Sequence, residues 1–291
     1  MGFVQTVKNI WKIEDLRQRL LITLGFIAIY RFGSFVVLPG INPESLVALQ
    51  QNASSGLLSL LDMFSGGAFA NASIFALGIM PYISASIVMQ LLGIAVPAFQ
   101  KMQREGESGR TKINQYTRYL TVAILLIQGP AYLYGAVGAA IPGGFWDWVL
   151  PSTVILAGGS MFILWLGERI TDKGVGNGIS FIILIGIIAR LPQAIVAEFD
   201  RLLNAPGGLV LLLLELLLLV AVTAAAIMLV QGVRKVPVQY AKRIVGNKQY
   251  GGVRQYIPLK VNAANVMPII FAQALMFIPI TFAQFSVSEG G

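Results

Sequence analysis

Residues 57–92 read LLSLLDMFSGGAFANASIFALGIMPYISASIVMQLL, and this stretch decides the fold. Its first part, residues 57–64, is apolar apart from one serine and one aspartate. At ~1.5 Å per residue, a helix of that length covers less than half of a bilayer core. The glycine pair at 66–67 then leads into a longer apolar span that Gly78 and Pro81 interrupt. Backbone that breaks at membrane depth is tolerated only inside protein or beside a water-filled cavity, so the stretch predicts a protected cavity.

The composition predicts the class of protein. Of the 291 residues, 56% are hydrophobic and only 12% are charged, and the charges cluster between long apolar runs. This pattern indicates a polytopic membrane protein, and the runs continue to the end of the chain, so the first is not a removable signal peptide. Cysteine and histidine are absent, which excludes disulfides, thiolate nucleophiles, Cys or His metal ligands and histidine general bases. We expect no catalytic residues, no metal and no cofactor.

Seven apolar windows of about 20 residues predict transmembrane helices. They cover residues 20–37, 72–96, 119–140, 149–166, 179–196, 209–230 and 263–282. The predicted fold is therefore an all-α membrane helix bundle of about seven spans, with a short re-entrant helix at residues 57–64.

The distribution of Lys and Arg predicts the orientation. Of the 21 basic residues, 18 fall in four clusters on one side of the predicted spans, at residues 8–19, 101–118, 169–173 and 234–260. Only Arg31, Arg190 and Arg201 lie near the other side. The basic side is expected to be cytoplasmic, which places the N-terminus inside and, after seven spans, the C-terminus outside.

Two helical patterns suggest more specific roles. Ile10, Ile13, Leu16 and Leu20 share one helical face, which predicts an interfacial N-terminal helix that is either a simple anchor or a partner contact. In the second span, an isoleucine stripe runs beside a polar stripe. The two stripes consist of Ile79, Ile83 and Ile87, and of Tyr82, Ser86 and Gln90. Such a face suits an aqueous pathway, although helix packing would also explain it. Pro81 is expected to free the carbonyl group of Leu77.

The loop at residues 231–260 carries the second strong signal. It contains seven basic and no acidic residues, interleaved with three tyrosines and two prolines. This composition suits docking on RNA or an anionic protein surface, with anionic lipid as the simpler alternative. Alternation at 236–240 and the turn formers Gly246-Asn247 and Gly251-Gly252 predict a hairpin.

Three other features are weaker. The motif at residues 174–178, GVGNG, predicts a tight turn capped by Asn177 or Ser180 rather than a nucleotide site, because no strand precedes it. Glu215 lies inside the sixth span and Arg31 near the outer end of the first. Buried charges in lipid suggest function, but Arg31 could snorkel outward and Glu215 could be structural.

Several motifs together resemble the SecY family, the large subunit of the bacterial protein-conducting translocon. They are SIFALGIMPYISAS at 73–86, EGESGR at 105–110, QYTRY at 115–119, GVGNGIS at 174–180, VQYAKR at 238–243 and PLKVN at 258–262. The resemblance runs from about Leu16 to Thr281 with the motifs in order. It implies a SecY-type bundle whose N-terminal half is residues 1–196 and whose C-terminal half begins at residues 197–291.

The resemblance also implies the site residues. The plug helix that closes the family's pore would be Leu57, Leu58, Leu60, Leu61, Met63 and Phe64. The isoleucine pore ring would include Ile79, Ile83, Ile183 and Ile270. The surfaces that receive the ribosome or the SecA motor would include Arg104, Arg110, Lys112, Arg234, Lys235, Lys242, Arg243, Lys248 and Arg254. Spans two and seven would form a lateral gate.

The implied partners are the SecE and SecG subunits, the SecA motor ATPase, ribosomal RNA, signal peptides, nascent chains and the lipid bilayer of the cytoplasmic membrane. The function would be to pass unfolded secretory polypeptides across this membrane and to release apolar segments sideways into it, with no bond chemistry. Family members have ten spans, whereas this sequence stops after the seventh, so either the sequence is partial or the last three spans and the rest of the ring come from elsewhere.

Two other classes of function are less well supported. A secondary transporter with broken helices would need several polar or charged groups at mid-membrane, and this sequence has almost none. An intramembrane enzyme would need an aspartate dyad or a Ser-Lys pair. Asp62, Asp147, Asp172 and Asp200 all fall outside the centres of the predicted spans.

Overall fold

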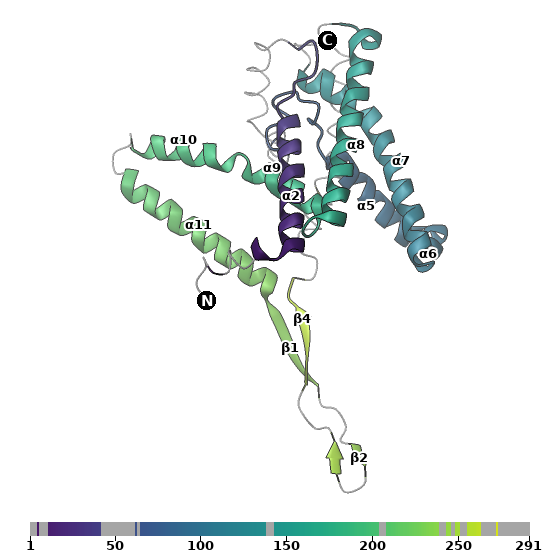
Figure 1. Ribbon diagram of the computed structural model, residues 1–291, viewed down its shortest axis with the longest axis vertical. Coiled ribbons are helices and arrows are strands. Elements are labelled where there is room, and N and C mark those ends of the chain that lie inside the picture. The colour runs from purple at the N-terminus through teal and green to yellow at the C-terminus, as the bar shows by residue number, and fades with distance from the viewer. Residues whose placement is uncertain are drawn as a thin grey trace. The chain divides into compact units, whose positions relative to one another are not determined.

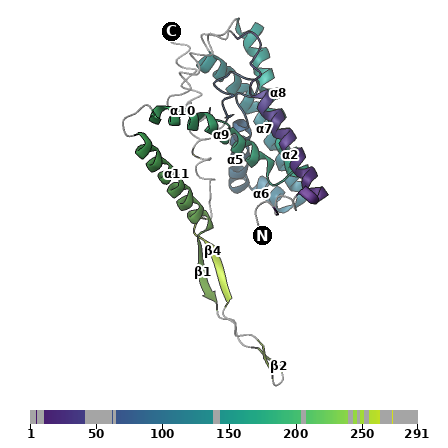
Figure 2. The same ribbon diagram turned by 60° about the vertical axis from the view of Figure 1, so that its left-hand side comes forward.

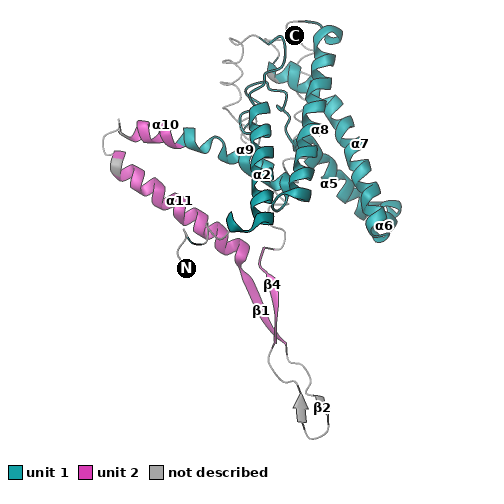
Figure 3. Cartoon of the chain, viewed as in Figure 1, with its two compact units in different colours: residues 1–194, 271–291 teal, residues 195–270 magenta. Residues whose placement is uncertain are grey.

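The computed structural model describes residues 11–41, 62, 65–137, 143–203, 208–238, 243–245, 248–250 and 255–262, with Gln5 and Ala272. The chain divides into two compact units, residues 1–194 with 271–291 and residues 195–270 (Figure 3). The division into family halves at residues 196 and 197 stays a prediction.

The first unit is a bundle of helices that pack side by side. Its described helices are α2 (Glu14–Gly33), α5 (Met80–Ala95), α6 (Pro97–Arg104), α7 (Glu107–Tyr132), α8 (Leu150–Lys173) and α9 (Gly178–Ile188). Short π-helices extend α7 (η1, Leu133–Val137) and precede α8 (η3, Phe145–Val149). Helix α8 packs against α2, α7 and α9, and α7 packs against α5 (Figures 1 and 2). Helix α10 (Leu191–Leu203) runs across the boundary between the two units.

Helix α8 approaches its neighbours closely because it carries small residues at the contacts. A Cβ atom at Gly159 would collide with the backbone carbonyl of Ile74, and one at Gly167 would press on the side chain of Ile179. On α7, a Cβ at Gly129 would collide with Thr153 of α8. Small residues at helix contacts are typical of membrane bundles, since lipid provides no hydrophobic force between helices and close van der Waals packing must do so.

The predicted spans match the helices to different degrees. Within the described residues, three helical stretches are long and apolar enough to cross a membrane: Phe145–Lys173, Gly178–Leu202 and Val210–Gln231. Helices α5 and α6 meet at a bend of 100° and would make a fourth span if counted together. Helices α2 and α7 cover the predicted spans at 20–37 and 119–140 but begin with several charged residues. The predicted span at 263–282 lies outside the described residues, apart from Ala272.

Two predictions about helix ends are wrong. Ile13 is extended (φ −82°, ψ 109°) and α2 begins at Glu14, so Leu16 and Leu20 belong to α2 and not to an uninterrupted interfacial helix from Ile10. The second span becomes helical only at Met80, so Pro81 occupies the first turn. A proline there costs no ladder hydrogen bond, because that N–H would be unpaired anyway, and the carbonyl of Leu77 is not freed.

The turn before α9 confirms the capping prediction for Asn177. Its Oδ1 accepts hydrogen bonds from the backbone N–H groups of Ile179 (3.1 Å) and Ser180 (3.3 Å). The same turn is tied to other helices: Thr171 Oγ1 of α8 accepts from the N–H of Gly178 (2.9 Å). The motif at 174–178 therefore works as a structural turn with a side-chain cap.

The second unit contains α11 (Gly208–Gln231) and a basic hairpin. Strand β1 (Val233–Val238) pairs antiparallel with β4 (Gln255–Lys260), and β2 (Arg243–Val245) pairs antiparallel with β3 (Lys248–Tyr250). The hairpin prediction is confirmed.

Candidate functional site

The centre of the first unit is a stretch of irregular backbone at residues 65–79, here called the broken segment. Gly66, Gly67 and Gly78 have φ values of 66°, 91° and 55°, and Ala72 has φ 45°. Three glycines at these positions are expected, because L side chains rarely adopt positive φ. The positive φ of Ala72, a non-glycine residue, is locally strained.

The backbone of the broken segment bonds to the chain that follows α2. The N–H of Leu38 donates to the carbonyl of Ala72 (3.0 Å), and the N–H of Ile74 donates to the carbonyl of Val36 (2.9 Å). These bonds flank the isolated bridge between Val37 and Ser73. They satisfy backbone groups that a membrane could not.

Asp62 organises the start of the broken segment. Only 1% of this residue is exposed. Its Oδ1 accepts the N–H of Ala70 (2.8 Å), and its backbone carbonyl accepts the N–H of Gly67 (3.0 Å) and the hydroxyl of Ser65 (3.1 Å). Its Oδ2 forms an ion pair with Arg190, which follows α9. A buried carboxylate needs such compensation, because desolvating a charge without a partner is costly.

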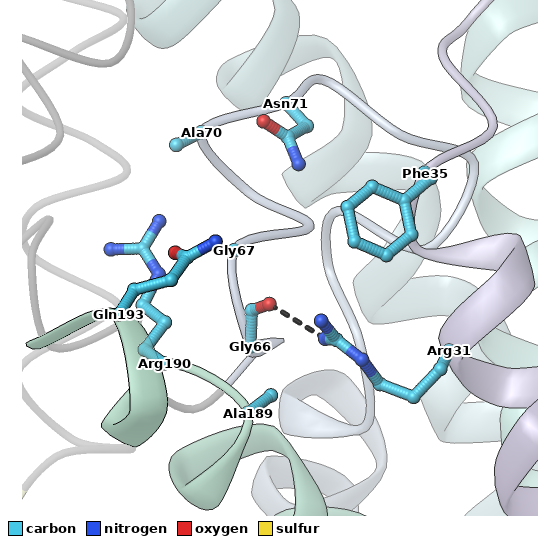
Figure 4. A pocket seen from close by; sticks show the side chains of 9 residues that line it. All are labelled: Arg31, Phe35, Gly66, Gly67, Ala70, Asn71, Ala189, Arg190 and Gln193. Carbon is cyan, nitrogen blue, oxygen red and sulfur yellow. Dashed lines mark hydrogen bonds between the residues drawn. The ribbon is translucent and has the colours of Figure 1, made fainter. Parts of the chain in front are cut away.

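Two arginines, one from α2 and one from the turn between α9 and α10, flank the glycine pair (Figure 4). Arg31, in the last turn of α2, donates from Nη1 to the carbonyl of Gly66 (2.9 Å), and its guanidinium lies over the ring of Phe35. Arg190 lies beside Gly67 on the other side of the loop. Together they line a cavity of about 390 Å³. Arg31 therefore turns towards the broken segment, and the alternative that it only snorkels outward is wrong.

Two tyrosines also tie the broken segment to helices. The hydroxyl of Tyr30 (α2) donates to the carbonyl of Ser65 (3.3 Å), and that of Tyr132 (α7) donates to the carbonyl of Phe69 (2.8 Å). Both tyrosines are buried. Since irregular backbone leaves carbonyl groups unpaired, buried side-chain donors are needed at this depth.

The broken segment also contributes to an apolar cluster of buried side chains, here called the central cluster. Its buried members come from α2, the broken segment, α8 and α9, and they are Tyr30, Ala68, Phe75, Ile79, Ile163, Leu166, Ile170 and Ile182. Three predicted ring residues meet there: Ile79 is buried, and Ile83 and Ile183 are partly buried and packed against it. The fourth, Ile270, lies outside the described residues, as do the predicted plug residues Leu57, Leu58, Leu60, Leu61, Met63 and Phe64.

The predicted docking residues that the structure describes lie on five elements. Arg104 ends α6, and Arg110 and Lys112 lie in the first turns of α7, where Lys112 approaches Glu105 (4.0 Å). Arg234 and Lys235 are consecutive in β1, so their side chains point to opposite faces of the hairpin. Arg243 and Lys248 lie in β2 and β3. Lys242 and Arg254 lie outside the described residues.

The ion pair between Asp62 and Arg190 was not predicted from the sequence. One signal was available: Asp62 is the only acid in an otherwise apolar stretch, and Arg190 is one of three basic residues away from the basic side. Over the described ranges, no group of three or more His, Cys, Asp or Glu residues could hold a metal ion. The described part of the site consists of an apolar centre and a hydrogen-bonded backbone loop.

Together, the fold and the site define a multi-pass membrane protein whose helices surround a broken, internally bonded segment. The SecY family model matches residues 73–290. A protein translocase subunit SecY of Streptomyces scabiei is 42% identical over 97% of this chain and 67% of its own length. The chain belongs to the SecY family.

Solved structures with a similar fold are channels. One comes from work on the plug domain of the SecY protein as a stabiliser of the closed translocation channel (TM-score 0.58, 17% identity). Another is Sec61 in the canine ribosome-channel complex (TM-score 0.50, 17% identity). Each covers 92% of this chain, and the chain spans 58% of each. At this identity they show the fold: the chain is a membrane helix bundle of the SecY type.

Proposed function

We propose that this chain forms part of a protein-conducting channel of the cytoplasmic membrane. The channel passes unfolded secretory polypeptides across the membrane and releases apolar segments sideways into lipid. The observation that carries the proposal is the central cluster, where Ile79, Ile83 and Ile183 gather beside the broken segment. Branched apolar side chains around a narrow waist make the entry of water unfavourable and offer a passing chain no fixed partner.

The relatives support this function. The Streptomyces scabiei protein is a protein translocase subunit, and the plug of the similar SecY structure stabilises the closed channel. In this chain, residues 57–64 would be the plug and Asp62 its described member. Helix α5 and the span at 263–282 would part as a lateral gate, a release driven by ~0.8 kcal/mol per buried CH₂ group. The mechanism needs no bond chemistry, so the protein would not be an enzyme.

The basic side would face the cytosol and receive partners. The N-terminus would lie inside, and the end of the seventh span outside. The hairpin and the start of α7 would receive the SecA motor or the ribosome, and the similar Sec61 structure is part of a canine ribosome-channel complex. The exposed side chains of Arg110, Lys112, Arg234 and Lys235 suit acidic RNA or protein surfaces. SecE and SecG would complete the channel around signal peptides and nascent chains.

The apolar constriction that Ile79, Ile83 and Ile183 are proposed to form can be tested by making it polar. In the full-length channel, Ile83→Ser with Ile183→Ser should raise resting ion conductance in a planar bilayer several-fold, because polar side chains remove the barrier to water. A matched control is Ile127→Ser on α7, where the side chain is 57% exposed. If both variants conduct like the wild type, these isoleucines do not form the waist.

The docking surface can be tested by reversing charge on the hairpin. Arg234→Glu and Lys235→Glu should each weaken binding of SecA or ribosomes and reduce its salt dependence, and the difference between them reports which face of β1 is used. Arg201→Glu is a control, since this exposed arginine lies near the other side of the membrane in the predicted topology. Normal binding by both hairpin variants across a salt titration would contradict the assignment.

A further inference from the structure

The ion pair between Asp62 and Arg190 joins two parts of the chain with different exposure. The side chain of Asp62 is 1% exposed, whereas that of Arg190 is 46% exposed. Asp62 also holds the turn of the broken segment through the N–H groups of Gly67 and Ala70. The carboxylate is thus bonded to the start of the broken segment, and the guanidinium belongs to the turn between α9 and α10.

The space around the pair favours a tight fit. A Cβ atom at Gly67 would lie 3.3 Å from Nη2 of Arg190, and one at Gly66 would lie 3.1 Å from Nη1 of Arg31. With positive φ at both glycines, larger residues would be strained as well as crowded. The glycine pair therefore lets both guanidinium groups reach the loop backbone and Asp62.

Because the two side chains differ in exposure, breaking the ion pair has a different cost for each of them. If Arg190 leaves, its side chain loses little burial, because it is already 46% exposed and lines the cavity. Asp62 would remain buried without its counter-charge, which is strongly unfavourable, and it regains hydration only if the broken segment moves out. Loss of the ion pair and displacement of the segment are therefore coupled.

We propose that Asp62 and Arg190 form an ionic latch that holds Asp62, and the start of the broken segment at Gly67 and Ala70, in the pore-closing position. Arg31 is a second, weaker hold through the carbonyl of Gly66. The latch sets the opening equilibrium of the channel, and with it the strength of signal that a substrate needs to open the channel. This inference rests on the proposed channel function and adds a positioning role for three charged residues.

The first test is Arg190→Gln in the full-length channel. We expect resting ion conductance to rise roughly tenfold, because one lost charge-assisted contact shifts an equilibrium by about that factor. Export of a substrate with a defective signal should rise as well, while export of a normal substrate continues. The matched control is Arg118→Gln: Arg118 is also 46% exposed and pairs with Glu168 (2.6 Å), but Glu168 is 36% exposed and leaves no buried charge behind.

A second variant separates the latch from general damage. Asp62→Asn combined with Arg190→Gln removes the unpaired buried charge, so its leak should fall between those of the wild type and of Arg190→Gln. Arg190→Lys should retain most of the closure. If Arg190→Gln does not assemble, the double variant carries the test, with an expected leak about threefold above the wild type.

Movement of the segment can be followed directly, because the chain contains no cysteine. Ala70 is buried, with 2% of it exposed, so Ala70→Cys should react slowly with a membrane-impermeant maleimide. Adding Arg190→Gln should speed labelling roughly tenfold, and adding Arg118→Gln should not.

The latch would be overturned if Arg190→Gln showed the ion conductance and the labelling rate of the wild type. If only the double variant can be tested, a conductance equal to that of the wild type would overturn it. Failure of the wild-type channel to export any substrate would instead overturn the proposed function.

Discussion

Helices α8 and α11 are both 24 residues long and both apolar enough to cross a membrane, yet they pack differently. Half of the apolar window of α8 is buried and none of that of α11. Helix α8 carries Gly159, Ser160 and Gly167 at buried positions, whereas α11 is mostly Leu, Val and Ala after its first glycine. Hydrophobicity places both helices in lipid, but the glycines of α8 are what let its neighbours approach closely.

The largest expected effect comes from filling the closest contact of α8. Gly159→Val should destabilise the folded protein by about 3 kcal/mol, because its Cβ would collide with the backbone carbonyl of Ile74, which cannot move aside as a side-chain tip could. The measurement is reversible unfolding in detergent. The adjacent Gly158 is the control: a Cβ there meets nothing within 4 Å, so Gly158→Ala should be neutral or stabilising by up to about 1 kcal/mol. Equal effects at the two positions would remove the packing explanation.

A smaller effect is expected from removing volume. Ile163→Ala in α8 should cost about 2 kcal/mol, since the side chain is fully buried and its loss leaves a cavity. Leu217→Ala in α11 should change stability by less than about 0.5 kcal/mol, because this side chain is 70% exposed. The same unfolding assay compares the two. A cost at Leu217 as large as that at Ile163 would mean that α11 is packed against something in the assembled channel.

The packed region should also depend on single hydrogen bonds to irregular backbone. Tyr132→Phe should cost about 1 kcal/mol, because it leaves the buried carbonyl of Phe69 without its donor. Tyr119→Phe, at a side chain 71% exposed, should be neutral. Hydrogen exchange of the amides at 65–79 should rise only in the first variant, and protection that is equal in both would show that this bond does not hold the segment.

The smallest effect is expected at the exposed ion pair between α7 and α8. Arg118→Gln should change stability by no more than about 0.5 kcal/mol, because both side chains reach water and solvent screens the pair. Thermal unfolding at low and high salt checks this. A loss of more than about 1 kcal/mol would show that charge as well as small residues holds α8 in place.

Local patterns predicted several elements well. The window at 209–230 became α11 (Gly208–Gln231), Asn177 caps α9, and the alternating residues of the basic loop became paired strands. Each of these depends on interactions within a few residues or on hydropathy alone, so the sequence carries the information directly. The ring residues Ile79, Ile83 and Ile183 came from the family resemblance, and the structure brings them to one cluster.

The ends of α2 and α5 were not predictable in the same way. A continuous apolar pattern across 72–79 favours a helix, but the backbone at Ala72 and Ile74 instead bonds to Leu38 and Val36. A helix there would require giving up these long-range bonds, and tertiary contacts override a weak local preference. The same contacts account for the positive φ at Ala72, which no propensity would suggest.

The amino-acid sequence alone was enough to predict a membrane protein, the positions of most spans and the family. It also predicted which side of the membrane carries the basic surface. Hydropathy, charge asymmetry and long motifs depend only on the order of residues along the chain. The ion pair between the buried Asp62 and Arg190 and the hydrogen bond from Arg31 to Gly66 could be found only in the folded structure. The same is true of the buried share of α8, which is half of its apolar window. These pairings join residues far apart in the sequence, and burial and geometry, which set their energy, exist only in the folded bundle.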